Sequence, residues 1–404
     1  MQDYEDQDLN ELPSTSPNFR TDLAKKLEEL VPEAIADGKV DVVKLKELLA
    51  EDAGEPNERF GLFWPGKKQA LRAAQDPTTA TLRPAKDESK DWDTTNNIFI
   101  EGDNLEVLKV LQKQYHNSIK MIYIDPPYNT GKDFVYPDNF KEGLQNYLEF
   151  SQQVDEGNKK ISTNTETAGR YHSNWLNMMY PRLKLARNLL TDDGVIFISI
   201  DDAEQANLKK ICDEIFGEGN FVSQIVWQKK YAPQNDAKYF STSHDYILIY
   251  ARSIERFSRN LLPRSKEQLA RYKNIDNDPR GPWQSDNFTV ATYSASYDYP
   301  ITLPSGRTIN PTPGRCWRTS YENYKKLVAD NRISFGLDGD NVPRIKRFLS
   351  EVQDGSVPET LWLYKDVGHN QGAATSLKNL MDGKKYFDSP KPVTLIEFMA
   401  KIAS

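Results

Sequence analysis

The residues best suited to chemistry follow a short apolar run at positions 119–124. An acid, two prolines and an aromatic residue stand there in succession as Asp125, Pro126, Pro127 and Tyr128. An apolar run that stops at a turn signal predicts a strand buried on both faces of a parallel sheet, and proline cannot donate to a continuing ladder. We therefore expect Asp125 at the carboxyl end of that strand, the edge where open α/β sheets bind ligands.

The longer string from Asp125 to Gly131 reads Asp-Pro-Pro-Tyr-Asn-Thr-Gly. It resembles the DPPY motif of amino-directed DNA methyltransferases. The resemblance runs from about Phe60 to the last residue. Within the family, the chain most resembles the modification (Mod) subunits of type III restriction-modification systems and related adenine-specific enzymes. Residues 134–140 resemble the loop that follows the motif in this family. The resemblance implies S-adenosyl-L-methionine as methyl donor.

The chemistry of such enzymes explains the residue types. The exocyclic amino group of adenine is a poor nucleophile because its lone pair is delocalised into the ring. If Asp125 and the carbonyl of Pro126 each accept one amino hydrogen, the lone pair is localised and points at the methyl sulfonium. Pro126 and Pro127 limit the motion of these acceptors, and Tyr128 would stack on a base flipped out of the duplex. Relatives with Ser in place of the acid usually methylate cytosine N4, so Asp125 favours adenine N6.

The resemblance also implies a cofactor site. The string Gly-Asp-Asn-Leu at 102–105 precedes the DPPY strand here as it does in the family, which implies that Asp103 contacts the adenosine part of the cofactor. Asp125 is also an implied cofactor-binding residue. An Asp at such a helix start is equally well explained as an N-cap. Both interpretations of Asp103 stay open.

A second part of the cofactor site is expected near the end of the chain. Residues 372–380 and 387–393 resemble motif X, the loop and helix that touch the methionine end of the cofactor. The implied cofactor-binding residues are Phe387, Lys391 and Pro392, and Pro392 is expected to start a helix. The family's Phe-x-Gly-x-Gly cofactor loop occurs nowhere in the sequence. For that reason we expect the chain alone to bind the cofactor weakly or not at all and not to methylate DNA. One edge of the strand at 119–124 is then either unpaired or paired with a neighbour that it does not meet in the family.

Two apolar runs, at 225–227 and 246–250, predict an antiparallel hairpin at the edge of the sheet. At its tip Lys229, Lys230 and Tyr231 lie where the family holds the flipped nucleotide. A solvated hairpin tip is the alternative interpretation. These three residues are the candidate DNA-binding residues.

Charge is distributed unevenly along the chain. The net charge is -7 and the isoelectric point is near 5.4. Residues 1–60 carry 7 basic and 16 acidic side chains, whereas residues 225–350 carry 20 basic and 12 acidic ones. Because phosphate attraction acts over about 8 Å at physiological salt, the local excess matters more than the total. Between 253 and 366, basic residues alternate with aromatic ones, as on nucleic-acid surfaces.

Composition excludes several classes of protein. No stretch of the 404 residues approaches a membrane span, and the N-terminus is acidic rather than basic and apolar, so we expect neither a membrane protein nor a secreted one. Cys212 and Cys316 are the only cysteines, there are four histidines, and none has metal-ligand spacing. We expect a reduced, cytoplasmic protein without a metal site.

Other patterns predict the elements around the site. Strands are expected at 97–101, where the first βαβ unit begins, and at 195–200, where a second βαβ unit ends. Asp201 and Asp202 look like a catalytic pair, but capping of a helix at 203–216 is the favoured interpretation. The fold class is thus α/β, with a Rossmann-like methyltransferase sheet, incomplete at the C-terminal end, and an inserted target-recognition domain.

Four domains are expected. They are an acidic helical region at 1–59, a catalytic core at 60–252, the target-recognition domain at 253–366 and the start of the cofactor-binding half at 367–404. In the first of these, leucine-rich stripes predict two helices that pack on the main domain, with partner binding as the alternative.

Three functions remain open. The favoured one is adenine-N6 methylation of double-stranded DNA as the modification subunit of a restriction-modification system, with a restriction (Res) subunit and a second copy of the chain as possible partners. The second is an inactive, truncated Mod fragment that binds DNA and needs a C-terminal partner chain. The third is methylation of RNA or protein, which Asp125 disfavours because related glutamine-methylating loops have Asn before the two prolines.

Overall fold

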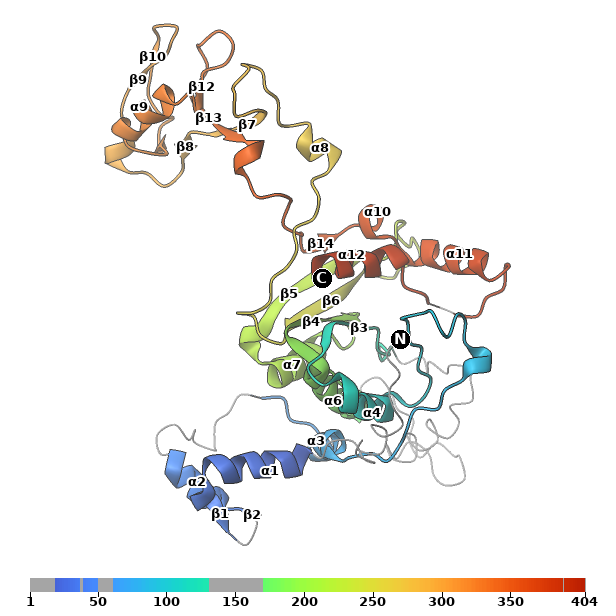
Figure 1. Ribbon diagram of the computed structural model, residues 1–404. Helices are drawn as coiled ribbons and strands as arrows, with labels where there is room; N and C mark the ends of the chain where they lie inside the picture. The colour runs from blue at the N-terminus through green and yellow to red at the C-terminus, as the bar shows by residue number, and fades with distance from the viewer. Residues whose placement is uncertain (1–18, 37–38, 50–60, 131–169, 388, 404) are drawn as a thin grey trace. The chain divides into compact units, whose positions relative to one another are not determined.

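The protein is described from a computed structural model that covers residues 19–36, 39–49, 61–130, 170–387 and 389–403. The expected loop at 134–140 lies outside them. The chain divides into unit 1, Met1–Asn260 with Glu359–Ser404, and unit 2, Leu261–Pro358 (Figure 1). Unit 2 falls inside the interval expected for target recognition. No helix in the described part of the chain is long and apolar enough to cross a membrane.

Unit 1 is organised around a mixed sheet whose described strands have the order β14-β5-β6-β4-β3. Their bounds are β3 Ile119–Ile124, β4 Leu190–Ile200, β5 Phe221–Gln228, β6 His244–Ala251 and β14 Leu361–Trp362. β3 is parallel to β4 and β14 is parallel to β5, whereas β6 is antiparallel to both of its neighbours. Together with the flanking helices, this sheet confirms the predicted Rossmann-like α/β class.

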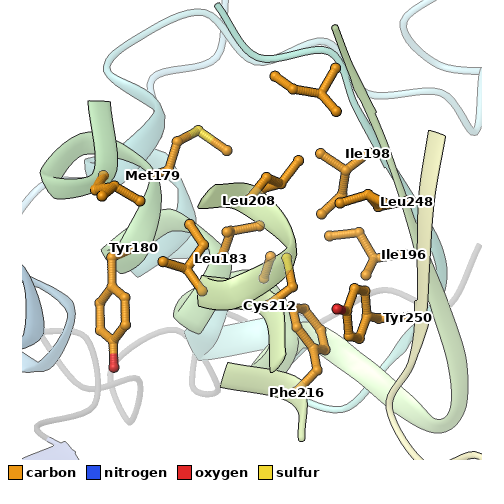
Figure 2. Packing of buried hydrophobic residues seen from close by; sticks show 14 of the residues in the cluster. Met179, Tyr180, Leu183, Ile196, Ile198, Leu208, Cys212, Phe216, Leu248 and Tyr250 are labelled. Atoms are coloured by element: carbon orange, nitrogen blue, oxygen red, sulfur yellow. The ribbon is translucent and has the colours of Figure 1, made fainter. Parts of the chain in front are cut away.

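One face of the sheet packs on two helices, α6 (Arg170–Leu189) and α7 (Gln205–Phe216). Alternate residues of β4 point to this face, because side chains along a strand alternate between its two sides. Ile196 and Ile198 are fully buried there against α6 and α7 (Figure 2). Burial of each such side chain contributes about 1.5 to 3 kcal/mol, so this cluster holds β4 and its neighbours rigidly in register.

Further helices complete unit 1. α3 (Lys67–Gln75) and α4 (Asn104–Tyr115) pack on α6. α12 (Val393–Ala403) packs against β3 and β4, and Figure 1 shows it on the side of the sheet away from α6 and α7. The last helix therefore reaches the strand that carries the DPPY loop. Unit 1 also contains η4 Lys86–Glu88, η5 Glu218–Asn220, α10 Tyr364–Val367 and α11 Asn370–Leu380.

The predicted strand at 97–101 is wrong. These residues form no regular element, and Ile98 and Phe99 are 70% and 90% exposed. A strand needs a neighbour to pair with, and the described residues supply none on that side of β3. β3 itself, predicted to be buried on both faces, is only half-buried and pairs with β4 alone among the described strands. The βαβ unit expected before β3 does not form among the described residues.

The hairpin of β5 and β6 forms as predicted, but it does not lie at the sheet edge. β14 pairs with β5 beyond it. A strand of two residues leaves no periodic pattern in the sequence, so β14 was not predictable. The helix that follows β4 ends at Gly217, whose φ of 93° is the left-handed conformation expected of a glycine C-cap.

Unit 2 is built from short strands around its own apolar cluster. Its main sheet has the order β12-β13-β7, with β7 Trp283–Asn287, β12 Ile333–Ser334 and β13 Arg344–Phe348. The helix α9 (Tyr321–Ala329) contributes Tyr324 to the cluster. The remaining elements are α8 Lys266–Leu269, β8 Thr289–Val290, η6 Ala295–Tyr297, β9 Ile301–Thr302, β10 Thr308–Ile309, β11 Cys316–Trp317 and η7 Leu349–Glu351.

The N-terminal helices form where the leucine pattern predicts them, as α1 (Phe19–Leu30) and α2 (Val42–Leu49). Between them lie η2 Pro32–Ala34, β1 Ile35–Ala36 and β2 Lys39–Val40, and both helices contact η2. Leu23, Leu30 and Leu48 are exposed. No other described residue therefore packs over these three leucines of the predicted apolar helix faces.

Candidate active site

The DPPY loop begins where β3 ends and is fixed from two sides. The indole Nε1 of Trp175, on α6, donates to the carbonyl oxygen of Pro127 at 2.7 Å. Two residues later Asn129 adopts a left-handed conformation with φ of 59°, which asparagine tolerates better than most residues. Its side-chain Nδ2 donates to Glu204 Oε1 at 2.5 Å. The loop is therefore held both by its backbone and by a side chain, as a site that positions reacting atoms requires.

Glu204 is the anchor of this loop, and sequence reasoning missed it. Its side chain is fully buried. Besides Asn129, it accepts hydrogen bonds from Asn207 Nδ2 at 2.8 Å and binds His172 Nδ1 at 2.7 Å. The carboxylate thus joins α6, the first turn of α7 and the DPPY loop. Because it stands at the N-cap position of α7, its sequence context resembles ordinary helix capping, and no residue pattern distinguishes it.

The predicted capping of a helix at 203–216 by Asp201 and Asp202 is wrong, because α7 begins at Gln205 and Glu204 stands at its N-cap position. Asp201 Oδ1 accepts a hydrogen bond from the backbone N–H of Ala203 at 3.0 Å, in the turn before α7. Burial raises the pKa of Asp201, and the ammonium of Lys229 opposes that rise. These contacts are those of a turn-stabilising residue.

The structure joins two predicted site residues that are far apart in the sequence. Lys391 Nζ lies 2.6 Å from Asp125 Oδ2, and the two side chains are 12% and 31% exposed. The same ammonium lies 5.1 Å from the ring centroid of Tyr128, within cation–π range. Pro392 is buried immediately before α12, which starts at Val393. The DPPY loop and the motif X segment therefore form one site.

A second carboxylate faces Tyr128 from the hairpin. The hydroxyl of Tyr128 donates to Asp245 Oδ2 at 3.5 Å, and Asp245 Oδ1 forms an ion pair with Lys229. Burial raises the pKa of Tyr128, and the negative charges of Asp125 and Asp245 raise it further, so the phenol keeps its proton. Burial also raises the pKa of Asp245, against the opposing effect of Lys229. The ring of Tyr128 is thus orientated by its hydroxyl.

The three candidate DNA-binding residues follow β5 directly. Lys229 is half-buried and occupied by Asp245, an arrangement that the sequence did not predict. Lys230 Nζ donates to Gln234 Oε1 at 3.1 Å, and Tyr231 is 57% exposed. The ring of Tyr231 lies 5.5 Å from that of His369. Contact of Lys230 and Tyr231 with DNA remains a prediction.

Asp103 is the N-cap of α4. Its Oδ1 accepts hydrogen bonds from the backbone N–H groups of Leu105 and Glu106, at 2.9 and 3.1 Å. Its Oδ2 lies 3.4 Å from Arg182 Nη2, and the side chain is 56% exposed. Capping therefore uses one oxygen and leaves the second turned towards Arg182 and solvent. Phe387 is also exposed.

Among the residues that the structure describes, no group of His, Cys, Asp or Glu side chains is arranged to hold a metal ion. Cys212, in unit 1, and Cys316, in unit 2, are both free thiols and fully buried. Burial raises the pKa of Cys212. Cys316 donates to the carbonyl oxygen of Thr292 at 3.3 Å.

Comparisons with known proteins identify the family of the chain. Residues 119–404 match the family model described as DNA methylase. The chain is 37% identical to the StyLTI Mod subunit, a type III restriction-modification enzyme of Salmonella typhimurium, over 98% of this chain and 60% of that protein. It is 33% identical to the EcoPI Mod subunit of Escherichia phage P1, over 89% of this chain and 60% of the relative.

A type II enzyme is also similar. The methyltransferase M.KpnI of Klebsiella pneumoniae is 36% identical, over 76% of this chain and 72% of the relative. The chain spans about 60% of the length of the two type III relatives. The matched residues 119–404 include β3, the DPPY loop, Lys391 and α12, all of which meet at the site. The chain therefore belongs to the DNA methylase family.

Proposed function

We propose that the protein transfers a methyl group from S-adenosyl-L-methionine to N6 of a flipped adenine in double-stranded DNA, as the modification subunit of a restriction-modification system. The observation that carries the proposal is the contact of Lys391 with both Asp125 and Tyr128. It unites an acceptor carboxylate, a stacking ring and the motif X segment in a single site. The type III relatives support the modification-subunit role.

The residues present fit the cofactor. Its amino-acid end carries an ammonium and a carboxylate, and Asp125 and Lys391 could supply one partner for each. The second oxygen of Asp103 is exposed and suits a ribose hydroxyl, and the exposed ring of Phe387 suits an apolar contact. Pro392 fixes the backbone beside Lys391. When bound, the cofactor would supply an electrophilic methyl group.

The chain's own residues would prepare the amino group. Lys391 binds one oxygen of Asp125, which keeps the carboxylate orientated and leaves it further acceptor capacity for an amino hydrogen. The carbonyl of Pro126 would accept the other hydrogen. Tyr128, held by Asp245, would stack on the flipped base.

The direct test uses tritiated S-adenosylmethionine and phage DNA grown without adenine methylation. We expect radioactivity in N6-methyladenine after digestion of the DNA to nucleosides. Radioactivity in N4-methylcytosine would show that cytosine, and not adenine, is the base that is methylated. DNA binding without any transfer would favour the alternative, an inactive DNA-binding fragment.

Tyr128→Ala should lower the rate of methyl transfer about ten- to a hundredfold, since base-aromatic stacking contributes about 1 to 3 kcal/mol. Tyr128→Phe is the matched control, because it keeps the ring and loses only the hydrogen bond to Asp245. We expect it to retain most of the activity in single-turnover assays. Equal losses for both variants would show that the hydroxyl, rather than the stacking ring, is what matters.

Lys391→Ala should weaken S-adenosylmethionine binding about tenfold, because it removes a charge-assisted contact to the cofactor. Isothermal titration calorimetry would measure this. Lys401→Ala is the control, because it removes the same charge from an exposed residue in the last turn of α12 that has no ion pair in the described part of the chain. If the Lys391→Ala variant bound S-adenosylmethionine with unchanged affinity, Lys391 would not contact the cofactor and would only orientate Asp125.

We propose further that the protein acts in the cytoplasm, together with a restriction subunit and as a homodimer. The names of the type III relatives support the first of these partners. Size-exclusion chromatography with light scattering would test the homodimer.

A further inference from the structure

Most arginines of unit 2 are neutralised within the unit, which the structure describes throughout. Those in ion pairs with carboxylates are Arg280, Arg307, Arg318, Arg332 and Arg347. Arg264 and Arg315 donate instead to the backbone carbonyl oxygens of Gln353 and Thr289. Arg271 and Arg344 remain, and neither has a carboxylate within ion-pair distance in unit 2.

Both of these arginines line the same groove. It has a volume of about 260 Å³, and Lys273, also without a carboxylate partner in the unit, lines it with them. Trp283, buried, and the hydroxyls of Ser285 and Ser334 form part of its wall. The groove therefore combines uncompensated positive charge with groups that donate and accept hydrogen bonds.

The groove lies on the open face of the β12-β13-β7 sheet. Ser334 stands opposite Arg344, and Ser285 stands opposite Lys346, two residues further along β13. Since side chains alternate along a strand, these residues share one face. Ile333 and Ile345 point to the other face, where they pack into the apolar cluster with Tyr324 of α9. The face that carries Arg344 is open only at that end of the sheet, because Lys346 and Phe348, further along β13 on the same face, are buried.

We propose that this groove of unit 2 binds double-stranded DNA, with Arg271 and Lys273 on phosphates and Arg344 at the base edges. The inference rests on the proposed function and deepens it by naming the DNA-contacting face. A sheet face that carries cations and hydroxyls suits a DNA groove, which β-ribbon readers enter with their strands. Arginine can bind guanine through two hydrogen bonds, and phosphate contacts supply affinity without sequence information.

The test compares two double variants of the whole chain. Arg271→Ala with Lys273→Ala removes two charges from the groove. Lys325→Ala with Lys326→Ala removes two charges from α9, the helix on the opposite side of the sheet. Fluorescence anisotropy with a labelled mixed-sequence duplex, over a range of salt concentrations, gives the affinity and its salt slope for each. Thermal melting of both variants confirms folding.

We expect the groove variant to bind at least tenfold more weakly, with a salt slope smaller by about 2, since each lost phosphate contact removes about 0.9. The α9 variant should stay within twofold of the parent. Arg344→Ala should reduce discrimination between a modifiable fragment and a mixed-sequence competitor about tenfold.

The outcomes separate the two proposals. If the parent binds DNA and both double variants bind equally well, the groove assignment is wrong while the proposed function stands. If the parent binds no duplex at any salt concentration, both proposals fall. If duplex RNA displaces the labelled DNA more effectively than unlabelled DNA does, the groove recognises RNA instead.

Discussion

Asp125→Ala should reduce methyl transfer on the order of a hundred- to a thousandfold, while DNA affinity stays within a few fold. In the proposed mechanism the carboxylate acts on the amino group of the base, and loss of one such preorganised contact costs this much in comparable sites. It does not contact phosphates, so binding is spared. Both quantities should be measured in one preparation, by single-turnover transfer of a tritiated methyl group and by anisotropy.

Asp125→Asn is the matched control for charge. It keeps the shape of the side chain and one oxygen acceptor but replaces the ion pair with Lys391 by at most a hydrogen bond. If Asp125→Ala kept activity within tenfold of the parent, the carboxylate would have no part in the chemistry. A parallel loss of DNA binding would instead indicate that the ion pair holds the fold of the site.

Glu204→Ala should lower the free energy of unfolding by about 2 to 4 kcal/mol and also impair transfer. Removal of this buried carboxylate breaks its hydrogen bonds with Asn129 and Asn207 and its contact with the ring of His172. Buried donors left unsatisfied cost about 1 to 3 kcal/mol each, part of which is recovered when water enters. Urea denaturation would measure the change.

Glu204→Gln separates the two roles of this residue. Its amide oxygen can still accept from Asn129, so we expect it to fold with a smaller loss of stability and to keep the DPPY loop in place. Normal activity in Glu204→Ala, despite the loss of stability, would mean that the loop does not depend on this anchor.

The sequence predicted the elements that have strong local patterns. The apolar runs at β3, β4, β5 and β6 predict strands that the structure contains, and the string at 125–131 predicted the family. The prediction of a strand at 97–101 was wrong because strand formation also depends on a pairing partner, which the local sequence pattern does not specify. An apolar run becomes a strand only where another strand offers its backbone groups, and β3 is the outermost described strand on that side.

The site was predicted as a set of residues but not as a set of contacts. Asp125 and Lys391 were both expected in it, yet their ion pair depends on α12 packing against β3, which local spacing does not specify. Lys229 was expected to meet DNA, but its ammonium neutralises Asp245. An acid at the head of the apolar run of β6 was a signal that such a partner is required.

The buried thiols have a practical consequence. Reagents such as maleimides attack thiolates at the surface, and both native cysteines are inaccessible in the folded protein. A single cysteine introduced at an exposed position, such as Tyr231→Cys among the candidate DNA-binding residues, would therefore react with one fluorophore without removal of the native cysteines. Because the native cysteines would not be labelled, the fluorescence would come from the introduced position alone. It could then report in real time whether a base leaves the DNA duplex.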